Sequence, residues 1–147
     1  MLQKNYLVGG LALFAVLLFS AQLFAQVDKR QDLMKDNSAA NKAIKGAVEA
    51  KDYATIETKA RDIMGNAEKI VSLFPKGSDK GKTKATPAIW EKSDDFGKAA
   101  KNLNKAAGEL AAAAKAKDEA AVTAKVKGVS DACGGCHKAF RAEKYAE

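Results

Sequence analysis

The sequence is poor in the residues that most often carry chemistry or fill a large core. It has 147 residues with one histidine, two cysteines and two prolines. One histidine excludes a bis-imidazole iron site and a histidine-rich metal site, and leaves no spare general base once it is used. After residue 25 the chain has six aromatic side chains, while 26 of its 122 residues are alanine. Burial stabilises a fold by roughly 25 cal/mol per Å² of apolar surface, so a core made mostly of alanine and valine gains little from each side chain. The composition therefore indicates that something other than side chains fills the centre.

The first 25 residues differ from the rest and predict a secretory signal peptide. They hold one charge, Lys4, followed by an apolar stretch from Leu7 to Phe19 and a short segment that ends at Ala25. Cleavage there would leave a domain of residues 26–147 with a net charge of +6, from 24 basic and 18 acidic residues. Cleavage after Ala21 and an uncleaved membrane anchor are the alternatives. In each case the functional part leaves the cytoplasm, so nucleic acid is not an expected partner despite the basic charge.

Hydrophobic spacing predicts four helices and no strand after residue 26. Apolar residues recur with alternating steps of four and three, which keeps one stripe of each helix facing its neighbours. The first helix, about Val27 to Ala50, is less regular because Asn37 and Asn41 share its stripe. The other stripes run over Ile56–Phe74, Ile89–Ala114 and Val122–Phe140.

The breaks between these stretches predict an all-α, antiparallel up-down four-helix bundle. Lys51-Asp52 and Lys117-Asp118 are short breaks that suit antiparallel neighbours. The long break, residues 74–86, contains Pro75, two glycines and four lysines, which cannot continue a helix. Thr86-Pro87 then supplies an N-cap and a first-turn proline for the next helix.

The last stretch carries the motif Cys133-Gly-Gly-Cys136-His137, the attachment signature of c-type haem. On a helix these three side chains share one face, since they stand at i, i+3 and i+4. Two thiols can then add to the two vinyl groups on one porphyrin edge, and the imidazole can reach the metal. The glycines between them leave room for the backbone to lie against the ring. The sequence thus predicts one covalently attached haem c, with Cys133 and Cys136 as its thioether ligands and His137 as the proximal iron ligand.

Other uses of two nearby cysteines fit this chain less well. A thioredoxin-like redox pair needs a βαβ context, which the pattern lacks. A disulfide between cysteines three residues apart closes a very small loop and stabilises little. A zinc site needs a fourth ligand, and the sequence has no other cysteine or histidine. Secretion also suits haem attachment, which takes place outside the bacterial cytoplasm.

The haem-attachment motif lies near the C-terminus, in the last predicted helix of the bundle. With this arrangement the chain resembles the cytochrome c-prime family, also called class II cytochromes c. Three stretches are similar to that family: Cys133–His137 followed by Phe140-Arg141, Pro87–Trp90 followed by Phe96, and Arg30–Asn37. The resemblance covers essentially all of residues 26–147. It implies that the residue four beyond Arg30 lies over the distal face of the haem.

That distal position is Met34, where many members of the family have leucine and a five-coordinate iron. The resemblance therefore implies the low-spin branch, in which a methionine sulfur is the sixth ligand. A thioether prefers ferrous iron, so His/Met ligation raises the reduction potential and favours electron transfer. Two alternatives remain, that Met34 only packs on the haem or that Leu33 is the distal group. Arg30 and Arg141 match family positions near the haem edge, where they would contact propionates.

Together these features predict an exported, periplasmic, monohaem electron carrier that is not an enzyme, because iron already uses the single imidazole. The alternative is a five-coordinate binder of nitric oxide or carbon monoxide. Expected partners are redox proteins, and the lysine-rich loop (Lys76, Lys80, Lys82, Lys84) is a candidate docking site for an acidic one. The resemblance allows a monomer or a homodimer, since some relatives pair through their first two helices.

Overall fold

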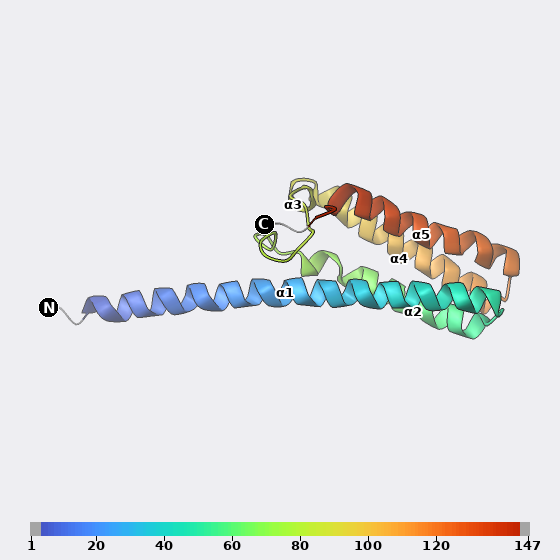
Figure 1. Cartoon of the computed structure of the whole chain (residues 1–147), viewed down its shortest axis with the longest axis horizontal. Coiled ribbons are helices and arrows are strands. Elements are labelled where there is room, and N and C mark those ends of the chain that lie inside the picture. Colours follow the sequence, from blue (N-terminus) through green and yellow to red (C-terminus); the bar gives the residue numbers. More distant parts are fainter. Residues whose placement is uncertain (1–3, 145–147) are drawn as a thin grey trace.

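The computed structural model describes residues 4–144, and the positions of side chains from residue 25 onward. Four long helices form the molecule: α1 (Lys4–Glu49), α2 (Tyr53–Lys69), α4 (Ser93–Lys115) and α5 (Glu119–Phe140). Two short helical segments, η1 (Val71–Leu73) and α3 (Ala88–Glu91), flank the crossover loop between α2 and α4. Figure 1 shows the four long helices side by side as a bundle. The all-α bundle predicted from the spacing is thus confirmed.

The helices pack in the order α1, α2, α4, α5, whereas α1 and α5 touch each other little. The stripe of α2 is buried as its spacing predicts, at Ile56, Ala60, Ile63 and Ala67. Opposite it, α4 buries Phe96, Ala100, Leu103, Ala107, Leu110, Ala111 and Ala114. Small side chains on both helices allow a close α2–α4 contact.

Two short turns close the end of the bundle opposite the crossover loop, and both have the sequence Ala-Lys-Asp. In each turn the lysine has a positive φ, 54° at Lys51 and 55° at Lys117. Asp52 and Asp118 then accept hydrogen bonds from backbone N–H groups in the first turns of α2 and α5. The N–H groups of each lysine and aspartate bond back to the preceding helix in the Schellman pattern. An ion pair of 2.8 Å between Lys51 and Glu119 joins the two turns.

The third predicted helix differs from the observed one at its start. It is divided at Lys92, whose φ of −121° and ψ of 48° end α3 before α4 begins. Thr86 was expected to cap this helix, but its Oγ1 is buried without a hydrogen-bond partner. The prediction of a hydroxyl cap is therefore wrong, although through its carbonyl, 3.1 Å from the Ile89 nitrogen, Thr86 does accept a bond from the start of the helix. The N–H of Thr86 donates to the carbonyl of Phe140, which fixes the chain beside the end of α5.

Helix α1 is longer than the spacing predicts, since it runs without a break from Lys4 through residue 25 to Glu49. Figure 1 shows its first part extending past the other helices. The first three residues of the predicted signal peptide and the last three of the predicted domain lie outside the described residues. Over the part of the chain whose side chains are described, 25–144, no helix is long and apolar enough to cross a bilayer.

Candidate haem site

A cavity of about 520 Å³ opens between α1 and α5 at the end of the bundle where the crossover loop lies. Its wall combines residues of α1, the end of α2, the loop, the helices that follow and the end of α5. The lining residues are Arg30, Gln31, Met34, Lys35, Ser38, Ile70, Phe74, Thr83, Lys84, Ala85, Ile89, Phe96, Cys136, His137, Phe140 and Arg141. This volume lies in the range of pockets that hold small molecules and cofactors. Five of the six predicted site residues, Arg30, Met34, Cys136, His137 and Arg141, line it, whereas Cys133 is not among its lining residues.

The motif of α5 presents its reactive side chains from the last two turns of the helix. Cys133 and Cys136 are half-buried and not bonded to each other, and Cys136 and His137 line the cavity. Burial raises the pKa of both thiols, and the pKa of Cys136 is raised further by its neighbour Cys133. Partial burial, followed by the positive charge of Arg141, lowers the pKa of His137. A neutral imidazole is the form that binds a metal ion.

Met34 and Leu33 occupy different surroundings although they are neighbours in α1. Leu33 is 7% exposed and belongs to the hydrophobic core. Met34 is half-buried and lines the cavity that His137 also lines. The cause is helix phase, because adjacent residues point about 100° apart on an α-helix. Met34 therefore faces the cavity, and Leu33 does not line it.

Arg30, also on α1, is buried at 4% exposure and fixes the crossover loop to the helix. Its guanidinium donates to Ser78 Oγ at 2.9 Å, to the Ser78 carbonyl at 2.6 Å and to Thr83 Oγ1 at 2.6 Å. It also lies 4.6 Å from the centre of the Phe74 ring. Burial lowers the pKa of Arg30, and the negative charge of Asp79 opposes that shift. Its partners are thus hydroxyl, carbonyl and aromatic groups, and a buried cation of this kind on a cavity wall favours an anionic group inside.

Three aromatic rings form one side of the cavity. Phe74 meets Phe96 edge to face at 5.0 Å between ring centres, and Phe96 meets Phe140 in the same way at 5.2 Å. The rings come from the end of η1, from α4 and from α5, so they connect three parts of the bundle. Trp90 lies outside this series and donates its indole N–H to the Phe74 carbonyl at 2.9 Å. The rings give the cavity a rigid apolar wall suited to a flat apolar group.

The crossover loop joins α1 to the end of α5 and so spans the cavity. On one side Arg30 bonds to Ser78 and Thr83 as described, and Gln31 donates to the Lys82 carbonyl at 2.6 Å. On the other side Ala85 and Arg141 form an isolated antiparallel bridge. Sequence reasoning missed Ser78 and Thr83 because their partner on α1 lies 48 and 53 residues away. Their one sequence signal is that both are small hydroxyl residues in a lysine-rich loop.

A second and larger hollow, about 710 Å³, lies on the outer side of α1 and α2. Charged and small residues line it, among them Asp36, Ala39, Lys59, Asp62 and Gly65. It contains none of the predicted site residues. The chemistry-bearing side chains therefore point to the smaller cavity.

The residues around that smaller cavity fit a haem. Two half-buried thiols and an imidazole share one face of α5, and an apolar wall of rings stands beside them. A Cβ built on Gly134 or Gly135 meets no atom within 4 Å, so the backbone between the cysteines has open space beside it. The buried Arg30 supplies a cation on the wall where a carboxylate of the group would be stabilised.

This chain is similar to one known family and to several named proteins. The family model described as Cytochrome C' matches residues 25–141. The chain is 34% identical over 122 residues to a protein named cytochrome c-556 from Agrobacterium tumefaciens (strain II Chrys), covering 81% of this chain and 98% of that one. It is 35% identical over 123 residues to a cytochrome c' from Rhodospirillum rubrum, covering 81% and 83%.

Solved structures give the same result for the fold. The cytochrome c' from Thermochromatium tepidum superimposes with a TM-score of 0.75 at 30% identity, covering 81% of this chain and 95% of that one. The cytochrome c' from Rhodopseudomonas palustris superimposes with a TM-score of 0.73 at 31% identity, covering 81% and 97%.

The fold and the motif define a monohaem cytochrome built on a four-helix bundle, with one covalently attached haem c per chain. The chain belongs to the cytochrome c' family. Its members are haem proteins that carry electrons or bind ligands, so a haem electron carrier is the function that this membership supports.

Proposed function

We propose that this chain is an exported electron carrier in which His137 and Met34 bind the haem iron from opposite sides. Cys133 and Cys136 hold the haem covalently through thioether bonds. The haem supplies one-electron chemistry at its iron, and the protein sets the potential through its axial ligands and the burial of the site. Arg30, and at the mouth Arg141, interact with the carboxylate side of the group. No role as an enzyme is proposed, because the chain has no second imidazole to act as a base.

The observation that carries the proposal is that Met34 lines the same cavity as His137 while Leu33 is packed in the core. A thioether is a soft, flexible ligand that stabilises ferrous iron. Met34 comes from α1 and His137 from α5, the two helices that touch little and enclose the cavity. A group placed between these helices would therefore meet one candidate ligand on each side.

Carbon monoxide binding to the ferrous holoprotein tests this proposal. In the wild type, carbon monoxide should bind slowly or weakly, since it must displace an internal ligand held at high effective concentration. Met34→Ala should open the sixth position, give high-spin iron and bind carbon monoxide readily. Met64→Ala is the matched control, because Met64 is also half-buried but packs beside Gly108 between α2 and α4. Rapid binding in the wild type that Met34→Ala leaves unchanged would contradict the proposal.

The second candidate function is a five-coordinate haem protein that binds nitric oxide or carbon monoxide. It is favoured by the similarity to proteins named cytochrome c', such as those of Rhodospirillum rubrum and Rhodopseudomonas palustris at 35% and 36% identity. In that case Met34 only packs against the haem. The carbon monoxide experiment above separates the two functions.

Export to the periplasm forms part of the proposal. The apolar stretch before residue 25 has the form of a signal peptide, and the family model begins to match at residue 25. Cleavage after Ala25 would leave Gln26 as the first residue and shorten α1 to the part that packs in the bundle. Mass spectrometry of the protein from a periplasmic fraction should give the mass of residues 26–147 plus one haem. A full-length mass in the membrane fraction would contradict cleavage.

For the oligomeric state of this chain, a monomer and a homodimer both stay open. A solved cytochrome c' that is 29% identical, with a TM-score of 0.76 over 81% of this chain and 95% of that one, is described as having a ligand-controlled dimer dissociation. For this chain a monomer and a homodimer are both compatible with transfer of electrons to redox partner proteins. Analytical ultracentrifugation of the ferric and the carbon monoxide-bound ferrous forms distinguishes them.

A further inference from the structure

The positive charge of the mature chain is concentrated in two short segments. The crossover loop, residues 75–86, has four lysines and one aspartate, a net charge of +3. The C-terminal segment, residues 138–144, has three basic residues and one acidic residue, a net charge of +2. These 19 residues therefore hold +5 of the +6 carried by residues 26–147, and the remaining 103 residues hold +1.

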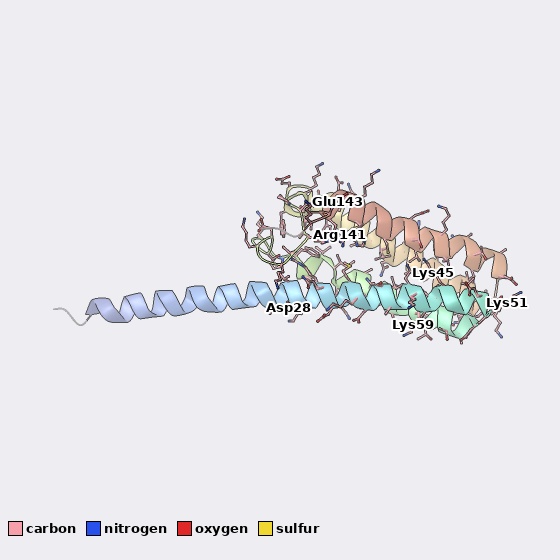
Figure 2. All side chains as sticks on the ribbon, viewed as in Figure 1. Asp28, Lys45, Lys51, Lys59, Arg141 and Glu143 are labelled. Atoms are coloured by element: carbon pink, nitrogen blue, oxygen red, sulfur yellow. The ribbon has the colours of Figure 1, made fainter. Side chains whose placement is uncertain are left out.

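The structure brings the two segments together at the mouth of the haem cavity. Ala85 pairs with Arg141, and the N–H of Ala142 donates to the Lys84 carbonyl at 2.8 Å. Lys84 and Arg141 line the cavity itself. Figure 1 shows the crossover loop and the end of α5 at the same end of the bundle, and Figure 2 places Arg141 and Glu143 there. We call these two joined segments the basic rim.

We propose that the basic rim is the docking surface for an acidic face of a redox partner protein. This inference rests on the proposed electron-carrier function and names the kind of partner that the same site serves. Lys76 and Lys82 are exposed, and complementary charge steers two proteins into encounter. Because the rim borders the cavity that His137 lines, docking there would bring the partner to the haem rather than to the far side of the bundle.

An apolar neighbour of the rim favours a protein as the partner. Val71, on η1 next to the crossover loop, is 49% exposed and is the one exposed large apolar side chain among residues 25–144. It stands between Ile70 and Phe74, which both line the cavity. Protein interfaces combine a small apolar centre with a charged rim. The rim also contains Asp79 and Glu143, so its charge is mixed, which suits a specific partner face.

The test compares two double variants of the holoprotein that have the same net charge. Lys76→Glu/Lys82→Glu reverses two exposed lysines in the rim, and neither forms an ion pair with another residue of the part of the chain whose side chains are described. Lys42→Glu/Lys45→Glu makes the same change on exposed positions of α1. Figure 2 shows Lys45 well away from Arg141, toward the turn end of the bundle. The measured quantity is the stopped-flow rate at which hexacyanoferrate(III), a small anionic oxidant, oxidises each ferrous protein.

At an ionic strength of about 0.1 M the rim variant should react about tenfold more slowly than the wild type, because attraction at the mouth becomes repulsion. The control variant should change by less than about twofold, since Lys42 and Lys45 follow the cavity residue Met34 by roughly 12 and 16 Å along α1, which exceeds the Debye length of about 10 Å at that ionic strength. Tris(phenanthroline)cobalt(III), a cationic oxidant, should give the opposite order. The differences should nearly vanish in 1 M salt. Equal slowing in both variants would mean that only net charge matters, and it would overturn the docking surface.

Poly-L-glutamate and lipid vesicles separate an acidic polypeptide from a membrane. Poly-L-glutamate should bind the wild type and slow its oxidation by hexacyanoferrate(III), but should not affect the rim variant. Vesicles of phosphatidylglycerol and phosphatidylcholine should sediment neither protein. Vesicle binding that the rim variant loses, without any effect of poly-L-glutamate, would assign the rim to a membrane surface and overturn the proposal. The spin state of the same samples tests the carrier function separately, so the two failures are distinguishable.

Discussion

Replacing Arg30 by leucine tests how the crossover loop is held over the cavity. The guanidinium makes three hydrogen bonds to Ser78 and Thr83 and lies over the Phe74 ring. Each bond contributes about 1 kcal/mol net, and a buried cation–π contact contributes about 1 kcal/mol more. Leucine also removes the cost of burying a charge, which offsets part of this loss. Arg30→Leu should therefore lower the free energy of unfolding by about 2–4 kcal/mol, since it also leaves buried Ser78 and Thr83 oxygens without their donor.

A matched substitution is available on the surface of α2. Arg61 bonds through Nε and Nη2 to Glu57 at 3.0 and 2.8 Å, but its side chain is 51% exposed. Exposed pairs of this kind contribute about 0–1 kcal/mol. Arg61→Leu should therefore change the free energy of unfolding by less than about 1 kcal/mol.

Guanidinium titration of the holoproteins, followed by helical circular dichroism, measures both changes. Amide hydrogen exchange adds a local readout, because the loop should lose protection in Arg30→Leu before the helices do. Arg30→Lys should recover only part of the stability, since an ammonium cannot reproduce the planar fork of the guanidinium. Equal effects of the two leucine variants, or a loss below about 1 kcal/mol in Arg30→Leu, would refute the assigned role of Arg30.

Three further outcomes are expected. Lys117→Gly should raise the free energy of unfolding by about 0.5–1 kcal/mol, because glycine adopts a φ of 55° without strain. By contrast, Lys101→Gly, at an exposed position inside α4, should lower it by about 1 kcal/mol, and urea titrations check both. Leu110→Ala should lower the free energy of unfolding by about 3–5 kcal/mol in the same titrations, because Leu110 is fully buried. A loss below about 2 kcal/mol would mean that α2 and α4 move together and close the cavity left by the leucine side chain. Apo-protein made without cytochrome maturation should melt less cooperatively than holoprotein by circular dichroism, because the cavity of about 520 Å³ then lacks its apolar filling; equal melting would contradict this.

Local patterns predicted much of the fold. The buried stripe of α2 agrees with its spacing, and so do both Lys-Asp breaks. These features depend on helix period and on capping, which act within a few residues. The motif of α5 could be interpreted in the same way, since i, i+3 and i+4 share a face on any helix. The roles of Cys133, Cys136, His137 and Met34 at the haem stay predictions.

Features that depend on distant residues were not predictable from local patterns. The bonds of Arg30 to Ser78 and Thr83 join α1 to a loop about fifty residues later. The bridge between Ala85 and Arg141 likewise joins the loop to the end of α5, and beside it the hydroxyl of Thr86 is buried without capping α3. The break at Lys92 occurs without a proline or glycine at that position, so no local breaker marks it.

Near-infrared magnetic circular dichroism of the ferric holoprotein tests the central claim most directly, because it identifies the pair of axial ligands on the iron. If His137 and Met34 are the ligands, the spectrum should be that of a low-spin haem with a sulfur-to-iron charge-transfer band. Met34→Ala should remove that band, and Met64→Ala should retain it. A wild-type spectrum of high-spin, five-coordinate iron would contradict the account and assign the cavity to ligand binding.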